Sequence, residues 1–225
     1  MNPAMLDKSE PYLKFKFLYP PRPENCITTD RMVGYEKTHF GQPKLNGSCC
    51  LIFTDGKTYF HYERKGEANR PKDFCLTDKE LEILNKHDGN NWNVFVGEYM
   101  NKSKAYKDGK PWTKAGNHKI VLFDILVYKG KYLLGSTFQQ RVELMDELFG
   151  KEEYDEWLYK ITDKIYRVKT FYGNFLALWN EIVKIDMLEG LVMKRMDAKL
   201  ERGGTLLNNV GSQVKVRKPS NSYPF

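Results

Sequence analysis

The 225-residue sequence predicts an α+β fold with mostly antiparallel sheets and flanking helices. Three observations support this prediction. Apolar runs of strand length are separated by glycine-containing turns, and Asp55-Gly56 between two of them is typical of a β-hairpin. Two later segments carry apolar residues at helical spacing instead. Strands and helices alternate irregularly, with several hairpins, as in α+β proteins.

The first part of the chain leads up to the hairpin. Residues 11–26 begin as an alternating strand and stop at a proline-rich stretch. Residues 27–43 are mixed and polar, and we expect a short helix or a loop there. Strands are expected over residues 49–54 and 58–64, on the two sides of Asp55-Gly56.

The remaining elements follow from caps and periodicity. Thr77 is a candidate N-cap for a short helix over residues 77–87, with acidic residues first and basic residues last. Residues 101–118 interleave lysines with Tyr106 and Trp112, which fits either a solvated loop or a basic flap that touches a polynucleotide. Further strands are expected over residues 93–100, 119–127, 188–194 and 213–218, and helices over residues 139–149 and 171–185.

Composition limits the classes of partner and compartment. The 36 Lys and Arg residues exceed the 29 Asp and Glu residues, which gives a net charge of +7 and suits a partner that carries phosphates. No uncharged apolar run reaches the ~18 residues of a membrane span, so no membrane association is expected. The N-terminus lacks a signal peptide, and the four cysteines lack paired spacing, so we expect an intracellular, cytoplasmic protein.

Isolated polar groups at strand ends are the candidates for chemistry. They are Lys44, Glu98, Asp124 and Glu189. In the last strand, Lys215 and Arg217 share one face and lie ~6.6 Å apart. A nucleophilic amine, carboxylates that bind Mg²⁺ and bases that neutralise phosphate charge are what nucleotidyl transfer requires. Nearby positive charges are also expected to make the Lys44 amine more reactive.

In this order, the motifs resemble those of the covalent nucleotidyltransferases, the family of ATP-dependent DNA ligases, RNA ligases and mRNA capping enzymes. The resemblance spans residues 42–218. Lys44-Leu45-Asn46-Gly47 matches the family's KxDG motif, which makes Lys44 the expected site of a lysine–AMP intermediate. Gln42-Pro43, just before it, corresponds to the adenine-contacting segment, and Leu45 belongs to the same nucleotide site.

The resemblance implies roles for the later motif residues. Arg64 is expected to contact phosphate or nucleotide, and Phe123 to stack on the purine. Glu98 and Glu189 are the expected metal ligands, with Glu98 also serving the ribose. Phosphate contacts are expected from the basic residues Lys194, Lys215 and Arg217, with Lys215 on the α-phosphate. The implied cofactors are therefore ATP, bound covalently as AMP, and Mg²⁺.

The resemblance also implies a domain plan. Residues 1–225 are expected to form a single, ATP-grasp-like adenylation domain and a monomer. The last motif ends seven residues before the end of the chain, so the OB-fold domain that usually follows is expected to be absent. The implied partners are nicked duplex DNA or RNA ends, with a separate clamp or DNA-binding protein as a further candidate.

Departures from the family pattern leave three functions open. Asn46 replaces the usual aspartate, and Cys49 stands where DNA ligases and capping enzymes usually carry an arginine. RNA ligases often lack that arginine, whereas the segment from Phe123 to Arg141 is similar to DNA ligases. An ATP-dependent DNA ligase is the favoured function and an RNA ligase the alternative. A non-catalytic nucleic-acid-binding module is the third possibility.

Overall fold

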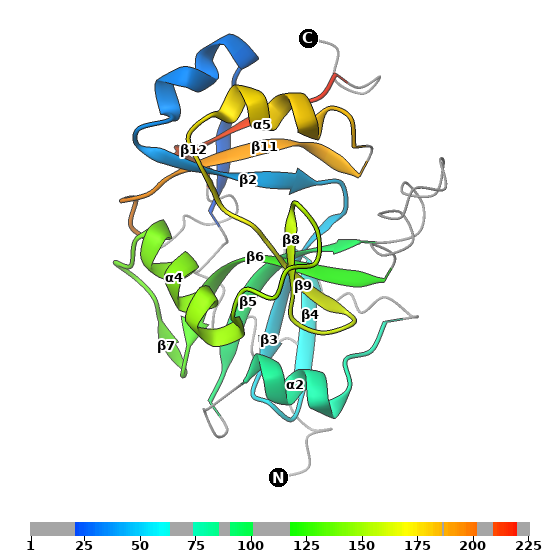
Figure 1. Cartoon of the computed structure of the whole chain (residues 1–225). Helices are drawn as coiled ribbons and strands as arrows, with labels where there is room; N and C mark the ends of the chain where they lie inside the picture. Colours follow the sequence, from blue (N-terminus) through cyan, green and yellow to red (C-terminus); the bar gives the residue numbers. More distant parts are fainter. Residues whose placement is uncertain are drawn as a thin grey trace.

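Two sheets form the frame of the molecule in the computed structural model (Figure 1). The structure describes residues 21–63, 74–85, 91–100, 118–185, 187–201 and 209–219. One sheet has the strand order β1-β12-β11-β2-β10, and the other has the order β4-β3-β5-β6-β9-β8 with β7 beside β6. Only the β1–β12 and β6–β9 pairs are parallel among the described strands, so the predicted α+β fold with mostly antiparallel sheets is confirmed.

The first sheet buries one face beneath two helical segments. Its strands are β1 (Arg22–Cys26), β2 (His39–Leu45), β10 (Phe171–Tyr172), β11 (Leu188–Arg195) and β12 (Asn209–Arg217). Helix α5 (Phe175–Ile182) and a 3-10 helix (Thr29–Tyr35) lie over this sheet (Figure 1). Apolar side chains from the helices and from alternate positions of β11 and β12 make one core cluster beneath them. The opposite face of the sheet therefore remains for other contacts.

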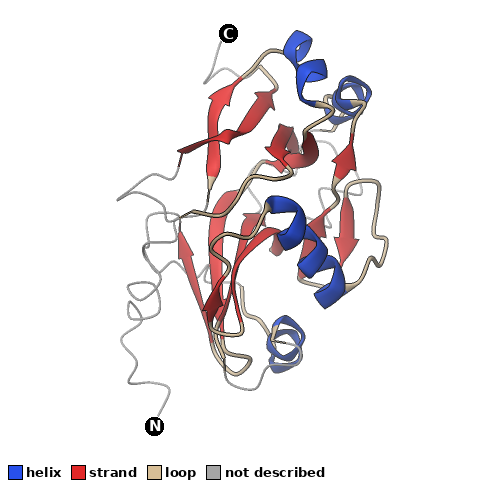
Figure 2. Ribbon diagram, turned by 90° about the vertical axis from the view of Figure 1, so that its left-hand side faces the viewer, coloured by secondary structure: helices blue, strands red, loops and turns tan. Residues whose placement is uncertain are grey.

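The second sheet carries the other two helices on one side. Its strands are β3 (Ser48–Thr54), β4 (Tyr59–Glu63), β5 (Asn93–Met100), β6 (Lys119–Tyr128), β7 (Lys131–Tyr132), β8 (Leu158–Lys160) and β9 (Ile165–Val168). Helices α2 (Asp78–Leu84) and α4 (Phe138–Phe149) lie on the same side of these strands (Figure 2). Each helix begins with a threonine capping box, at Thr77 and Thr137, and buries its apolar face against the sheet.

The predicted strands and helices of the motif regions are confirmed with small shifts of boundary. The Asp55-Gly56 hairpin joins β3 and β4, and its Asp55 carboxylate accepts hydrogen bonds from the N–H groups of Lys57 and Thr58. Thr77 is the N-cap of α2, as expected. The predicted strands at residues 93–100, 119–127, 188–194 and 213–218 correspond to β5, β6, β11 and β12.

Other local predictions were wrong where long-range pairing decides the structure. Residues 27–43 are not only helix or loop, because β2 begins at His39 and pairs with β11 and β10. A strand that was not predicted, β1, begins at Arg22 within the proline-rich stretch, and Pro23 is tolerated because β1 lies at the edge of the described part of its sheet. The predicted helix over residues 171–185 starts only at Phe175, because Gly173 and Asn174 have φ of 66° and 51°.

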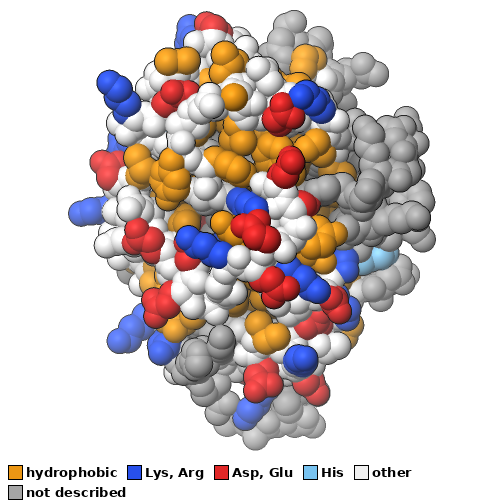
Figure 3. Space-filling view, in the orientation of Figure 1, with side chains coloured by type: hydrophobic (Ala, Val, Ile, Leu, Met, Phe, Trp, Pro, Cys, Tyr) orange, Lys and Arg blue, Asp and Glu red, His pale blue; other side chains and the backbone are white. Residues whose placement is uncertain are grey.

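Three predicted features lie outside the described residues. They are the strand that begins at residue 11, the basic segment between residues 101 and 117, and Arg64. No helix of the described residues is long and apolar enough to cross a membrane. On the face drawn in Figure 3, acidic and basic side chains are interspersed among apolar ones.

Candidate active site

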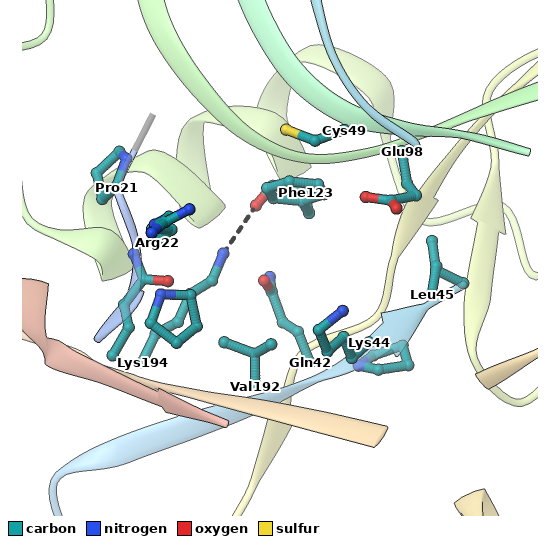
Figure 4. Close-up of a pocket in the computed structure, with 13 residues that line it drawn as sticks. Pro21, Arg22, Gln42, Lys44, Leu45, Cys49, Glu98, Phe123, Val192 and Lys194 are labelled. Atoms are coloured by element: carbon teal, nitrogen blue, oxygen red, sulfur yellow. Dashed lines mark hydrogen bonds between the residues drawn. The ribbon is translucent and has the colours of Figure 1, made fainter. Parts of the chain in front are cut away.

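A cleft lies between the two sheets, and side chains from both line it (Figure 4). The first sheet contributes residues of β1, β2, β11 and β12, and the second contributes one residue each of β3, β5 and β6. The lining residues are Pro21, Arg22, Pro23, Gln42, Pro43, Lys44, Leu45, Cys49, Glu98, Phe123, Val192, Lys194 and Gln213.

The floor of the cleft is one face of three adjacent strands. β11 lies between β2 and β12, and Gly190 pairs with Lys44 on one side and with Arg217 on the other. Two residues further along β11, Val192 pairs with Gln42 and with Lys215. Because alternate residues of a strand share a face, all these positions face the cleft, whereas Leu191, Met193, Val214 and Val216 face the core. Residues distant in the sequence are thus brought together by register alone.

Glu189 joins the candidate nucleophile to a base of the last strand. Its Oε2 accepts a charge-assisted hydrogen bond from Lys44 Nζ, and its Oε1 forms an ion pair with Arg217. The register of β11 against β2 shifts between Leu188 and Gly190, which is a β-bulge at Glu189. A bulge re-aims a side chain, and here it directs the carboxylate toward the cleft face beside Lys44. The predicted grouping of Lys44, Glu189 and Arg217 is therefore present in space.

Two motif glycines are needed for space. A Cβ added to Gly190 would lie 1.9 Å from the carbonyl oxygen of Val216, because β12 passes directly beside the bulge. A Cβ added to Gly47 would lie 2.5 Å from the carbonyl oxygen of Tyr99. The N–H of Gly47 donates a hydrogen bond to Glu98 Oε1 at 3.1 Å, so the turn after Lys44 sits against the Glu98 carboxylate.

Phe123 and Val192 form the apolar part of the cleft. The Phe123 ring, from β6, lies across the cleft from Val192 on β11, with the Gln42 side chain between them (Figure 4). Lys44 and Glu98 lie toward one end of the cleft, and Arg22 and Lys194 toward the other (Figure 4). The cleft therefore has apolar side chains on two sides, next to an end that carries Lys44 and the Glu98 carboxylate.

Lys194 lies beside the Phe123 ring, one strand row farther from Lys44 than Val192. Its Nζ donates to the carbonyl oxygen of Phe123 at 3.3 Å and lies 5.0 Å from the centre of that ring. The side chain is 4% exposed, and this desolvation lowers the pKa of Lys194 to about 8. The structure thus places Lys194 beside Phe123, and the phosphate contact expected from its motif stays a prediction.

The other predicted residues fall into two groups. Pro43 and Leu45 line the cleft, although Leu45 also belongs to the core beneath the sheet. Lys215 lies on the cleft face of β12, beside Val192 in the register. Asp124, a strand-end candidate, belongs elsewhere: its carboxylate forms a buried bidentate ion pair with Arg141, at 2.7 Å and 3.2 Å. Asp124 therefore anchors helix α4 to β6.

Several cleft residues had no predicted role. Gln213 alternates with Lys215 and Arg217 along β12, and this alternation is the sequence signal that could have identified it. Arg22 gave no such signal, because β1 reaches the cleft only through its parallel pairing with β12. Cys49 lies opposite Glu98 in the β3–β5 pair and contributes to the cleft wall.

The carboxylates of the site suit a hard cation in part. Within the described ranges, no three His, Cys, Asp or Glu side chains gather as a metal cluster. Glu189 contacts Lys44 directly. Glu98 accepts a hydrogen bond from the N–H of Gly47, in the turn that follows Lys44. Mg²⁺ in nucleotide sites is commonly held by one or two carboxylates together with phosphate oxygens and water, so two carboxylates fit this mode of binding.

Comparisons with known proteins agree with this geometry. The family model described as "ATP dependent DNA ligase domain" matches residues 30–207. The ligase domain of M. tuberculosis LigD has a TM-score of 0.62 at 18% identity over 90% of this chain and 60% of that one. A mycobacterial DNA ligase D complexed with ATP gives 0.59 at 18% identity, over 90% of this chain and 61% of that one. A Pmar-Lig structure gives 0.62 at 16% identity, over 93% of this chain and 50% of that one.

These similarities have clear limits of scope. The chain spans about 60% or less of the length of these three ligase structures. At 18% identity or below, they show a shared fold. No curated protein sequence gives a significant match. The matched family region ends at residue 207, so it includes Lys44 and Glu189 but not Lys215 and Arg217.

Proposed function

This chain belongs to the family of ATP-dependent DNA ligase domains, and we propose that it is catalytically active, with Lys44 as the nucleophile that takes AMP from ATP. The observation that carries the proposal is the contact of Lys44 with Glu189, which also pairs with Arg217. An amine, a carboxylate and a guanidinium come together at one end of the cleft. This arrangement suits attack on a phosphate whose developing charge must be neutralised.

The proposed first step is attack of the Lys44 amine on the α-phosphorus of ATP. The new P–N bond forms as the bond to pyrophosphate breaks, and pyrophosphate leaves. Lys44 must first part from Glu189 and lose its proton, because an ammonium has no lone pair to donate. A 5′-phosphate then displaces the lysine and takes the AMP, and a 3′-hydroxyl finally displaces AMP to form the phosphodiester.

The remaining residues of the site would bind the nucleotide. Phe123 and Val192 provide two apolar surfaces between which a purine fits by stacking. Arg217 and Lys215, on the same face of β12, would neutralise the α-phosphate and the leaving pyrophosphate. Glu98 and Glu189 would hold Mg²⁺, which supplies positive charge to the phosphates when bound.

We propose nicked duplex DNA as the substrate, because the matching family is that of DNA ligases. RNA ends are the second candidate. The observation that favours them is Cys49, which lies in the cleft wall at a position where the resembling DNA ligases carry an arginine. The domain plan stays a proposal as well: residues 1–225 would act as one adenylation domain, aided by a separate clamp or DNA-binding protein.

Strand sealing tests this function. The full chain, with ATP and Mg²⁺, is incubated with nicked duplex DNA, nicked duplex RNA and single-stranded RNA, and the products are separated by size. We expect sealing of nicked DNA by the wild type, no sealing by Lys44→Arg, and wild-type sealing by the exposed control Lys57→Arg. Equal sealing by Lys44→Arg would refute the proposed nucleophile. Nucleic-acid binding without sealing of any substrate would support the non-catalytic alternative instead.

A further inference from the structure

Two buried amide groups in the cleft carry hydrogen-bonding atoms without partners among the described residues. They are Gln42 Oε1 and Gln213 Nε2, on side chains that are 4% and 1% exposed. Leaving a buried amide atom unpaired is energetically costly, so native proteins rarely do so without a reason. Both side chains line the same cleft. Because both unpaired atoms belong to side chains that line one cleft, a polar ligand bound there would supply the missing hydrogen bonds.

The two glutamines flank the apolar floor from opposite sides. Gln42, on β2, pairs with Val192 of β11, and Gln213, on β12, pairs with Lys194 of β11. Their backbones are therefore separated by two strand spacings, about 9.6 Å across the sheet, and by two residues, about 6.6 Å, along the strands. Both amides belong to long side chains that line the same cleft, so they can reach neighbouring atoms on one edge of a base. The β11 residues between them are Val192, which lies across from Phe123 (Figure 4), and Lys194.

The free atoms differ in hydrogen-bonding character. Gln42 Nε2 donates to the hydroxyl of Thr170 at 3.2 Å, which orients the amide so that Oε1 remains as an acceptor. Gln213 Nε2 is a donor. Adenine offers a donor, its 6-amino group, flanked by two ring-nitrogen acceptors, N1 and N7. One acceptor and one donor across the cleft match this edge of the base.

We propose that Gln213 is a second base-contacting residue, which donates through Nε2 to N1 or N7 of adenine while Gln42 accepts from the 6-amino group. This inference rests on the proposed function, since it places ATP in the cleft. Guanine is disfavoured in the same pose, because its O6 is an acceptor and would face the acceptor Oε1 of Gln42. Selection for ATP thus depends on the amide of Gln42, and affinity for the base depends additionally on Gln213.

Equilibrium binding of ATP analogues tests this role separately from catalysis. ATP, 1-deaza-ATP and 7-deaza-ATP, in which one ring nitrogen is replaced by C–H, are titrated into the full-length Lys44→Arg protein. We expect one of the two analogues to bind about tenfold more weakly than ATP, as for the loss of one hydrogen bond. Adding Gln213→Met should weaken ATP binding by about the same factor and abolish the difference between ATP and that analogue.

Matched variants keep the test specific. Gln139→Met, an exposed position on helix α4, makes the same chemical change away from the cleft and should leave all three affinities unchanged. Thermal unfolding of each variant checks that it folds, and Gln213→Asn, which shortens the amide, serves as a second variant. The inference is overturned if the Lys44→Arg protein binds both analogues as tightly as ATP. It is also overturned if adding Gln213→Met leaves the difference in affinity between ATP and the weaker analogue unchanged.

Failure of this inference is distinguishable from failure of the proposed function. If Gln213 makes no contact with the base, ATP still binds and the wild type still seals nicks. The affinity for ATP is then the same with and without the Gln213→Met substitution. If the catalytic proposal fails, the wild type seals nothing, while the analogue titration still reports whether Gln213 touches the base.

Discussion

At the scale of single residues, Glu189 has the most connected position in the site. One of its carboxylate oxygens contacts Lys44 and the other pairs with Arg217, from the strands on either side. It therefore holds the proposed nucleophile beside the base proposed to neutralise phosphate charge, and the β-bulge in β11 places it there.

We predict that Glu189→Gln lowers the rate of lysine adenylation at least about 100-fold, because the amide keeps the shape but loses the charge that orients Lys44. The measurement is the single-turnover rate of transfer from labelled ATP. Glu181→Gln is the matched control, since Glu181 forms an exposed ion pair with Lys184 on helix α5 and should leave the rate unchanged. A rate for Glu189→Gln within a factor of two of the wild type contradicts the role.

Lys194 makes a pH-dependent contribution to stability. Its pKa is lowered to about 8 in the folded protein, from ~10.4 in the unfolded chain, because the side chain is desolvated. Between these values the unfolded state binds more protons, so stability rises with pH. Relative to Lys194→Met, the wild type should gain about 2 kcal/mol of unfolding free energy between roughly pH 7 and roughly pH 9.5. Urea unfolding at several pH values measures this, and a constant difference would contradict the burial of the charge.

At the scale of elements, the close packing of β11 against β12 limits what can occupy position 190. A Cβ there would lie 1.9 Å from a backbone oxygen of β12, which no side-chain movement relieves. We predict that Gly190→Ala destabilises the protein by about 3 kcal/mol, the upper range for overpacking, and that it displaces Glu189. Gly34→Ala is the control, because nothing lies within 4 Å of its added Cβ. Urea unfolding measures the free energy of unfolding of both variants. Equal values for Gly190→Ala and Gly34→Ala would contradict the close packing of β11 against β12.

The elements that could be predicted from the sequence are those with local signals. The hairpin at Asp55-Gly56, the capped helix α2 and the apolar strands β5 and β6 each carry their own pattern of caps, turns or periodicity. β1 and β9 were missed because these short strands are defined by pairing with the distant strands β12 and β6, and β8 was missed because it is only three residues long and pairs with β9. The start of α5 was misplaced because Gly173 and Asn174 take positive φ.

The candidate site was predictable to the same extent. Lys44, Glu189 and Arg217 were identified by motif order, and their strands are neighbours in the sheet. Gln213 and Arg22 were not identified, because their approach to the cleft depends on register and on a parallel edge strand. Asp124 looked like a site residue only until Arg141, seventeen positions later on α4, proved to be its partner.

At the scale of the whole molecule, the net charge of +7 predicts how the chain binds nucleic acid. Basic residues that contact phosphates release counterions, so affinity falls as salt rises. We predict that the affinity for nicked duplex DNA falls about tenfold or more between roughly 50 mM and roughly 200 mM salt, for a few phosphate contacts. Fluorescence anisotropy with a labelled nicked duplex measures it. An affinity that does not change with salt would contradict phosphate-directed binding.

The two-sheet frame gives each sheet a different share in the proposed reaction. The first sheet holds Lys44, Glu189 and Arg217 on a rigid floor, and the second brings Glu98 and Phe123 from above. The turn through Asn46-Gly47 joins the end of β2, which carries Lys44, to β3 of the second sheet. Catalysis as proposed therefore depends on the placement of one sheet over the other, beyond the order of motifs along the chain.

The most direct test of the account is to locate AMP on the protein. The wild type and Lys44→Arg are incubated with α-labelled ATP and Mg²⁺, and labelled protein is digested and mapped by mass spectrometry. We predict one adduct, on Lys44 in the wild type, and none in Lys44→Arg. An adduct on another lysine, or no adduct on active, folded wild-type protein, would contradict it.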